Sequence, residues 1–224
     1  NYNNIANANQ ALSAIEELGG PTTTRPKASN GEALICRAYS HFVLANMFCM
    51  PYNPATAGNC LGIPYMDHAE TDLNPRYERG TLQEVYEMIG KDIEAGIPLI
   101  DDTAYSVPKY HFNYKAACCF ASRYYLFMQD WDNAIKYATM ALTSNPSSLL
   151  RDYSAIAALP KGTSRHQEYV NSASTANFLL QAATSNSGLL FDWYSTAGRY
   201  SHGKLQGIYE TVQPKKGGPW GSSV

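Results

Sequence analysis

The sequence predicts an all-α fold, mostly helical, of stacked helical hairpins with long loops and an irregular C-terminal segment. Three observations support this prediction. Apolar residues recur at helical spacing in several windows between residues 1 and 146. Capping signals precede two of these windows. A further window repeats the residue spacing of a known helical-hairpin unit, which cannot bury its apolar face alone and needs stacked neighbours.

The hairpin window is residues 114–146, YKAACCFASRYYLFMQDWDNAIKYATMALTSNP. Its aromatic residue Tyr125, its small residues Ala134 and Ala141, and its closing Pro146 follow the offsets of a tetratricopeptide unit. The two alanines share one face of the second helix, which lets the first helix approach closely. We therefore predict a tetratricopeptide-type hairpin in this window.

The two helices of this hairpin are expected at 114–128 and 131–144, antiparallel to each other. Asp130 is a predicted N-cap for the second helix. Tyr125 and Trp131 flank the turn, where we expect them to cover the end of the hairpin.

Three upstream windows complete about five predicted helices. Residues 1–21 end in Gly-Gly-Pro, a helix-terminating signal. Ser29 and Glu32 stand three apart before the apolar pattern of residues 31–48, as a capping box requires, and Thr81 with Glu84 repeats this arrangement before residues 81–100. Pro98 is expected to stop the last of these helices.

A long loop, residues 49–80, interrupts the predicted helices. It exceeds what a packing connection needs, and such loops often carry function. Arg76 and Tyr77 are candidates for contacting a partner or a ligand. The more economical interpretation is that residues 63–65 pin the loop to the helices.

Composition excludes several classes of function. A formal charge of −2 and a pI near 6.2 give no reason to expect nucleic acid or an anionic membrane surface as a partner. No apolar run reaches transmembrane length. The five histidines show no metal-ligand spacing, and neither a G-x-S-x-G motif nor a marked carboxylate pair is present. We expect no enzyme activity, no catalytic residue, no cofactor and no metal.

The five cysteines show no metal-binding spacing either. Cys36, Cys118 and Cys119 are expected to act as small buried hydrophobic residues. Cys60 lies in the long loop and is either free or paired with Cys49.

Residues 147–224 change in character, because charges become sparse while Ser, Thr, Gly and Asn increase. We expect an irregular segment with one or two short strands or helices, packed on the repeat region of residues 1–146. Exposed aromatic rings and an arginine guanidinium are residue types suited to binding a ligand. The candidate ligand-binding residues of this segment are Trp193, Tyr194, Arg199, Tyr200 and Trp220. The alternative is that Trp193 and Trp220 are core anchors.

Taken together, GEALICRAYSHFVLANMF, GIPY, TLQEVYEMIGKDIEAGIPLI and YKAACCFASRYYLFMQDWDNAIKYATMAL resemble the SusD/RagB family of Bacteroidetes, whose members are nutrient-binding outer-membrane lipoproteins. The resemblance extends from about residue 1 to 144 and depends on the order and spacing of the motifs. The matching positions are Gly31, Glu32, Ala33, Arg37, Ala38, Phe42, Lys115, Ala116, Ala117, Arg123, Tyr125, Leu126, Trp131, Ala134, Ile135 and Ala138.

The resemblance implies a cell-surface glycan-binding lipoprotein of the outer membrane, which delivers an oligosaccharide to a SusC-like TonB-dependent β-barrel transporter. It also implies that segment 147–224 forms part of the ligand-binding subdomain and that loop 49–80 lies near the transporter. Family members are usually longer and begin with a signal peptide and a lipidated cysteine. We therefore expect this chain to be a fragment whose lipid anchor lies upstream.

A different class of function remains open, namely a tetratricopeptide scaffold that binds a peptide in a concave groove. Groove-binding repeats line their inner helices with Asn, Lys and Arg. The predicted helix 114–128 carries only Lys115 and Arg123, which favours a repeat buried against another part of the protein.

Overall fold

The computed structural model describes residues 2–72, 75–142, 146–160 and 163–180. Every regular element in these ranges is a helix, so the predicted all-α class is confirmed for the described part of the chain. The chain divides into two compact units, residues 1–149 and residues 150–224, and each is described by itself.

The first unit contains five α-helices in its described residues. Their bounds are α1 (Tyr2–Glu17), α2 (Thr24–Phe48), α3 (Leu82–Gly96), α4 (Tyr114–Phe127) and α5 (Trp131–Leu142). Short 3-10 turns occupy parts of the connections, at η1 (Ala57–Asn59), η2 (Ile97–Leu99), η3 (Asp102–Ala104), η4 (Pro108–Tyr110) and η5 (Pro146–Leu149).

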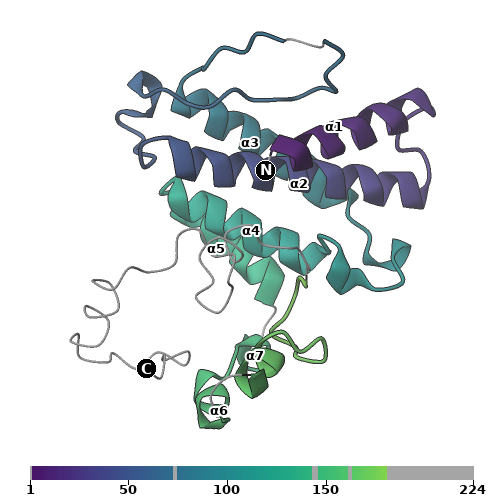
Figure 1. The fold of residues 1–224 in the computed structure, drawn as a ribbon, viewed down its shortest axis with the longest axis vertical. Coiled ribbons are helices and arrows are strands. Elements are labelled where there is room, and N and C mark those ends of the chain that lie inside the picture. The colour runs from purple at the N-terminus through teal and green to yellow at the C-terminus, as the bar shows by residue number, and fades with distance from the viewer. Residues whose placement is uncertain (1, 73–74, 143–145, 161–162, 181–224) are drawn as a thin grey trace, which may run out of the picture. The chain divides into compact units, whose positions relative to one another are not determined.

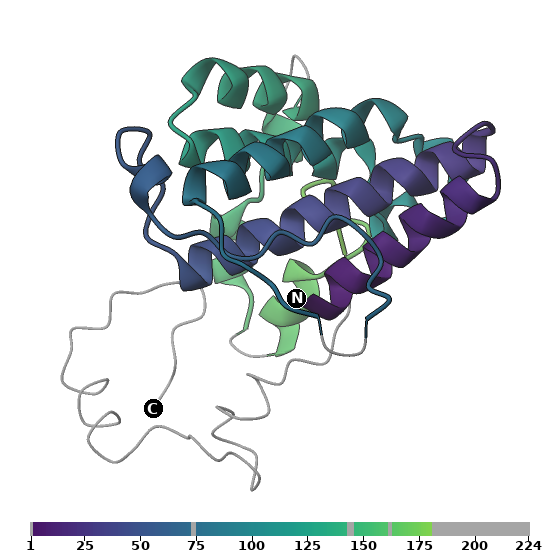
Figure 2. The ribbon, with the colours of Figure 1, turned by 90° about the horizontal axis from the view of Figure 1, so that it is seen from above.

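Helix α2 is the centre of this unit. It packs against α1 and α3, and Figure 2 shows it lying between them. Helices α4 and α5 form the predicted antiparallel hairpin, which contacts α2 and α3 through α4. Helix α2 buries residues on two sides, against α1 and α3, and α4 connects these helices to α5.

Local signals begin and end these helices largely as the sequence predicts. Helix α1 ends before Gly19 and Gly20, whose φ angles of +96° and +83° lie in the left-handed region that glycine adopts easily. Thr81 and Glu84 form the predicted capping box at α3. Asp130 caps α5, where its Oδ1 accepts the Asn133 backbone N–H at 3.1 Å.

The start of α2 corrects one prediction. Ser29 and Glu32 do not form a capping box, because the helix begins at Thr24 and both residues lie inside it. Pro26 does not prevent this early start, since the first turn of a helix needs no N–H donor at that position. The Glu32 carboxylate instead contacts His111 Nδ1 at 3.0 Å and accepts the Phe112 backbone N–H at 3.1 Å.

Aromatic rings fill the core between α2, α3 and α4. Phe42 is buried and meets other rings edge-to-face, among them Tyr86 and Phe120. Burial of a side chain of this size contributes about 1.5–3 kcal/mol. Where α2 crosses the end of α3, Gly31 and Gly96 face each other, and a Cβ at Gly31 would lie 2.8 Å from the Gly96 carbonyl oxygen. The two glycines therefore set how closely these helices approach.

The hairpin of α4 and α5 packs through small residues, as predicted. Ala134 and Ala141 are buried, and the carbonyl of Ala134 accepts a hydrogen bond from Ser122 Oγ across the hairpin at 2.8 Å. Tyr125 is buried and stacks on Tyr137 with ring centroids 5.3 Å apart. Trp131 is 56% exposed, so Tyr125 covers the hairpin as predicted, but its partner is Tyr137 and not Trp131.

All five cysteines are free thiols. Cys118 is fully buried, as predicted, whereas Cys36 and Cys119 are only partly buried. Cys49 and Cys60 form no disulfide, so Cys60 is free in the structure and the alternative of pairing with Cys49 is not seen.

The described part of the second unit contains two short helices, α6 (Tyr153–Ala158) and α7 (Thr163–Tyr169). Arg151 holds it together, because its guanidinium stacks on the Tyr169 ring at 3.9 Å and donates to the Tyr169 carbonyl at 2.8 Å. Asn177 is buried and donates to the same carbonyl at 3.0 Å. No described helix is both long and apolar enough to cross a membrane.

Candidate functional site

The loop between α2 and α3 is the longest connection of the first unit and the candidate functional site. Figure 1 shows it as the dark blue arch above α3. It has two parts that differ in environment. We call residues 61–68 the anchored segment, because the helices hold it, and the described residues between 69 and 79 the outer arm, because most of them are exposed.

A buried ion pair between α2 and α3 forms the base of the anchor. Arg37 of α2 donates from Nε to Asp92 Oδ2 at 2.7 Å and from Nη2 to Asp92 Oδ1 at 2.6 Å. The two side chains are only 10% and 7% exposed. Burial lowers the pKa of Arg37, but the hydrogen bonds and charge of Asp92 outweigh it and leave the pKa raised. A bidentate pair of this kind is rigid, because the planar guanidinium fits both carboxylate oxygens.

The remaining donor of Arg37 extends the network to α1 and to the loop. Its Nη1 donates to Asn9 Oδ1 at 2.9 Å and to the Asp67 carbonyl at 2.8 Å. Asn9 in turn donates from Nδ2 to the carbonyls of Met66 and His68, at 3.0 and 2.8 Å. Two side chains from two helices therefore hold three successive loop carbonyls.

Tyr65 and His41 complete the anchor. The Tyr65 hydroxyl donates to Asp92 Oδ2 at 2.6 Å, and its ring stacks on His41 with centroids 3.8 Å apart. His41 Nε2 accepts the Met66 backbone N–H at 3.0 Å, while its Nδ1 lies 3.0 Å from the Arg37 carbonyl. These contacts require a neutral ring with its proton on Nδ1. Burial lowers the pKa of His41 to about 4, which agrees with the neutral form.

The base of the loop is closed by backbone hydrogen bonds. Gly62 donates to the Gly80 carbonyl at 2.7 Å, and Leu82 donates to the Cys60 carbonyl at 2.8 Å. A Cβ at Gly62 would lie 2.6 Å from both the Thr81 carbonyl oxygen and Val85 Cγ2, so only glycine fits there.

These contacts decide what the anchored segment does. Each nitrogen of Arg37, both oxygens of Asp92 and both nitrogens of His41 take part in the network. The cluster therefore joins three helices to the loop. It positions the loop, and the interpretation that residues 63–65 pin the loop to the helices is confirmed, since Ile63 is also buried.

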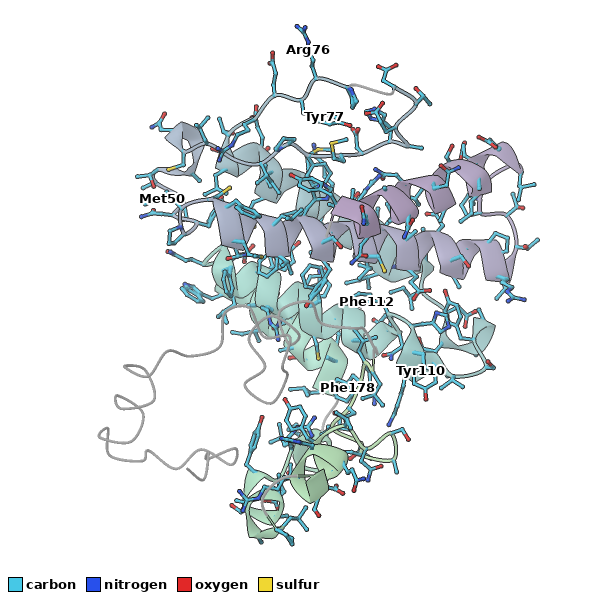
Figure 3. The ribbon with its side chains drawn as sticks, in the orientation of Figure 1. Met50, Arg76, Tyr77, Tyr110, Phe112 and Phe178 are labelled. Atoms are coloured by element: carbon cyan, nitrogen blue, oxygen red, sulfur yellow. The ribbon has the colours of Figure 1, made fainter. Side chains whose placement is uncertain are left out.

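The outer arm carries Arg76 and Tyr77. Figure 3 shows Arg76 at the outer edge of the loop, pointing away from the helices, and Tyr77 on the inner side of the arch. Tyr77 is 47% exposed and donates to Glu70 Oε2 at 2.5 Å, while Glu70 Oε1 accepts the backbone N–H of Thr71 and Asp72. The hydrogen bond to Glu70 raises the pKa of Tyr77 to about 12. The arm therefore offers an exposed ring, a cation and a carboxylate, a set suited to contacting a partner surface.

The predicted ligand-binding residues Trp193, Tyr194, Arg199, Tyr200 and Trp220 all lie outside the described residues. Their grouping stays a prediction. Among the described residues, no cluster of three His, Cys, Asp or Glu side chains could hold a metal ion.

Sequence reasoning missed the roles of Asn9, His41 and Asp92. A signal for Asp92 was present, because it stands beside Ile93 on the apolar face of its predicted helix. Charged residues in such positions are rarely buried unless they are paired. The sequence does not say which residue is the partner, since Arg37 is 55 positions away.

Comparison with known proteins gives a consistent result. Residues 1–126 match the model of a SusD-like family described as "starch-binding associating with outer membrane". No curated protein matches the chain. A SusD superfamily protein from Bacteroides thetaiotaomicron has 26% sequence identity and a TM-score of 0.59, over 70% of this chain and 34% of the other.

Two more solved structures show the same fold. A SusD-like carbohydrate-binding protein from Bacteroides vulgatus has 22% identity and a TM-score of 0.60, over 73% of this chain and 33% of the other. A laminarin-binding SusD-like protein has 19% identity and a TM-score of 0.52, over 70% and 32%. The chain thus spans about a third of the length of these structures. Because the family model covers more than half of the sequence, the chain belongs to the SusD-like family.

Proposed function

We propose that this protein captures oligosaccharides at the cell surface and delivers them to a TonB-dependent transporter of the outer membrane. The observation that carries the proposal is the family match over residues 1–126, with its description as starch-binding and associated with the outer membrane. Solved relatives whose names state carbohydrate or laminarin binding have the same fold and add support.

In this proposal the loop between α2 and α3 contacts the transporter, and a separate segment binds the glycan. The anchored segment is held to three helices, so the outer arm projects from a fixed base. A fixed base lowers the entropy lost when a surface binds its partner. We assign the outer arm, with Arg76 and Tyr77, to contact with the transporter.

Capture of the glycan is assigned to the aromatic residues of the C-terminal segment. In this proposal Trp193, Tyr194, Tyr200 and Trp220 form a stacking platform, and Arg199 donates to sugar hydroxyls. A single aromatic cluster of this kind gives millimolar to micromolar affinity, or about −4 to −8 kcal/mol.

Calorimetry tests glycan capture. The full-length protein is titrated with starch- and laminarin-derived oligosaccharides, and we expect a dissociation constant in the micromolar to millimolar range for at least one of them. Alanine variants of the five platform residues should bind more weakly while keeping the wild-type melting temperature. Failure of every neutral glycan to bind would refute the capture function. Uniform loss of stability among the variants would identify these residues as core instead.

Affinity purification from outer membranes tests delivery to the transporter. We expect the tagged full-length protein to retain a large β-barrel partner in detergent. The double variant Arg76→Ala/Tyr77→Ala should recover less of it. Tyr110→Ala, which removes another exposed tyrosine of the same unit, should recover as much as wild type. Recovery of the intact protein as a soluble cytoplasmic monomer would favour the scaffold alternative.

A further inference from the structure

A hollow of about 330 Å³ opens where α2 ends and the long loop begins. Figure 3 labels Met50 at this place, just beyond the C-terminal end of α2. Phe127, the last residue of α4, also lines it. The lining consists of Asn46, Cys49, Met50, Pro51, Tyr52 and Phe127.

Two aromatic rings of the lining are held in place by buried rings behind them. Tyr52 packs on Tyr86, with ring centroids 4.4 Å apart. Phe127 meets Phe42 edge-to-face at 5.1 Å and is itself 44% exposed. Packing against these rings restricts both side chains, so little conformational entropy is lost when a ligand stacks on them.

The polar groups of the lining are oriented but incompletely used. Asn46 donates from Nδ2 to the Phe42 carbonyl at 2.8 Å, which fixes its amide and leaves Oδ1 without a hydrogen-bond partner in the described part of the chain. The Tyr52 hydroxyl likewise has no hydrogen bond among these residues. Burial and the nearby Glu87 raise the pKa of Tyr52, so its hydroxyl keeps its proton and can donate. The hollow thus offers one acceptor and one donor beside two rings.

Charge indicates which ligand fits. None of the six lining residues is charged at neutral pH, and the two charged neighbours, Arg79 beside Cys49 and Glu87 near Tyr52, have opposite signs, so the hollow favours neither an anion nor a cation. A purely apolar ligand would displace water from Asn46 Oδ1 and the Tyr52 hydroxyl without giving either group a hydrogen bond. The volume lies at the small end of the range for ligand pockets, about 300–1,000 Å³. A neutral sugar unit satisfies all three conditions, because it has apolar C–H faces and hydroxyls at its edge.

We propose that this hollow is a sugar subsite, which binds one or two rings of a neutral oligosaccharide. The sugar stacks against Tyr52 and Phe127, and Asn46 Oδ1 accepts one of its hydroxyls. This proposal rests on the carbohydrate-binding function proposed above. It adds a second contact region, in the first unit of the chain, to the platform expected in the C-terminal segment.

Methyl NMR on the full-length protein provides the direct test. With methionine ¹³C-labelled at its methyl group, maltotriose and laminaritriose are titrated in separate experiments. We expect the Met50 methyl resonance to shift with at least one of them, because Met50 lines the hollow. Met47, three residues earlier and also exposed, does not line the hollow and serves as the internal control.

Variants of the lining provide a second test of the subsite. Phe127→Leu keeps bulk against Phe42 but removes the flat ring, so we expect an unchanged fold and binding at the Met50 methyl weakened about tenfold. Tyr52→Phe keeps the ring and removes only the hydroxyl, and binding should weaken by about threefold. Tyr110→Ala should leave the Met50 titration unchanged.

The outcomes separate this inference from the proposed function. If calorimetry detects glycan binding while the Met50 methyl stays still, the subsite is refuted and the proposed function stands. If the methyl shifts but Phe127→Leu binds like wild type, stacking in the hollow is refuted as well. If no glycan binds the full-length protein in calorimetry, the proposed function fails, and the subsite fails with it.

Discussion

The ion pair between Arg37 and Asp92 gives the sharpest test of how the long loop is held. We consider Asp92→Asn, which keeps the size of the side chain but removes its charge. The Arg37 guanidinium then stays 10% exposed without a counter-ion, and Tyr65 loses the strong acceptor of its 2.6 Å hydrogen bond.

The magnitude follows from the hydrogen bonds lost. Arg37 makes two charge-assisted bonds to Asp92, each contributing about 1.5–3 kcal/mol to the free energy of unfolding. The asparagine oxygen can keep one neutral bond, which restores about 1 kcal/mol. We therefore expect a net loss of about 2–5 kcal/mol, consistent with the roughly 3–5 kcal/mol measured when one partner of a buried pair is removed.

Urea unfolding followed by circular dichroism measures this loss. Glu87→Gln is the matched control, because it makes the same acid-to-amide change on an exposed position of the same helix. It should alter the free energy of unfolding by less than about 0.5 kcal/mol. Hydrogen exchange adds a local readout. The Met66 amide, bonded to His41, should exchange faster in Asp92→Asn, while the Tyr137 amide in α5 should change less.

A loss below about 1 kcal/mol for Asp92→Asn would show that the pair contributes no more than a surface ion pair. Unchanged exchange at Met66 would show that the loop is held without it. Either result refutes the role of the ion pair as the base of the anchor.

The remaining predictions concern pH and packing. The folded-state pKa of His41 is about 4 and its ordinary value is 6.5, so the free energy of unfolding should be highest above pH 6.5 and fall by about 3 kcal/mol as pH drops through 4. His41→Gln should remove this part of the pH dependence. Parallel pH profiles of the variant and the wild type would contradict the prediction. Gly31→Ala should lower the free energy of unfolding by about 1–3 kcal/mol, since the new Cβ would lie 2.8 Å from a backbone oxygen. Gly58→Ala should lower it less, because its Cβ would meet only the end of a flexible side chain. Equal melting temperatures of the two variants would refute the argument. Ala134→Leu should overpack the hairpin and cost about 1–3 kcal/mol, while Ile135→Ala on the exposed face should change the melting temperature little.

The sequence alone determined the helices and much of the first unit's packing. Thr81 with Glu84 marked the start of α3, and Ala134 with Ala141 marked the inner face of the hairpin. These signals are local, because a cap needs partners within one turn and a helical face repeats every three to four residues. The early start of α2 at Thr24 escaped prediction, since a capping box further along the chain, at Ser29, matched the rule equally well.

Only the tertiary structure decided how the long loop is held and where a hollow opens. The anchor joins Asn9, Arg37 and Asp92, which lie on three helices, and the hollow joins Tyr52 to Phe127 from segments 75 residues apart. No local pattern encodes such pairings, because helix packing alone determines which side chains meet. The five platform residues lie outside the described part of the chain, so sequence reasoning remains their only support. Local rules predict the elements of this protein, whereas the sites arise from contacts between elements, which depend on the whole fold.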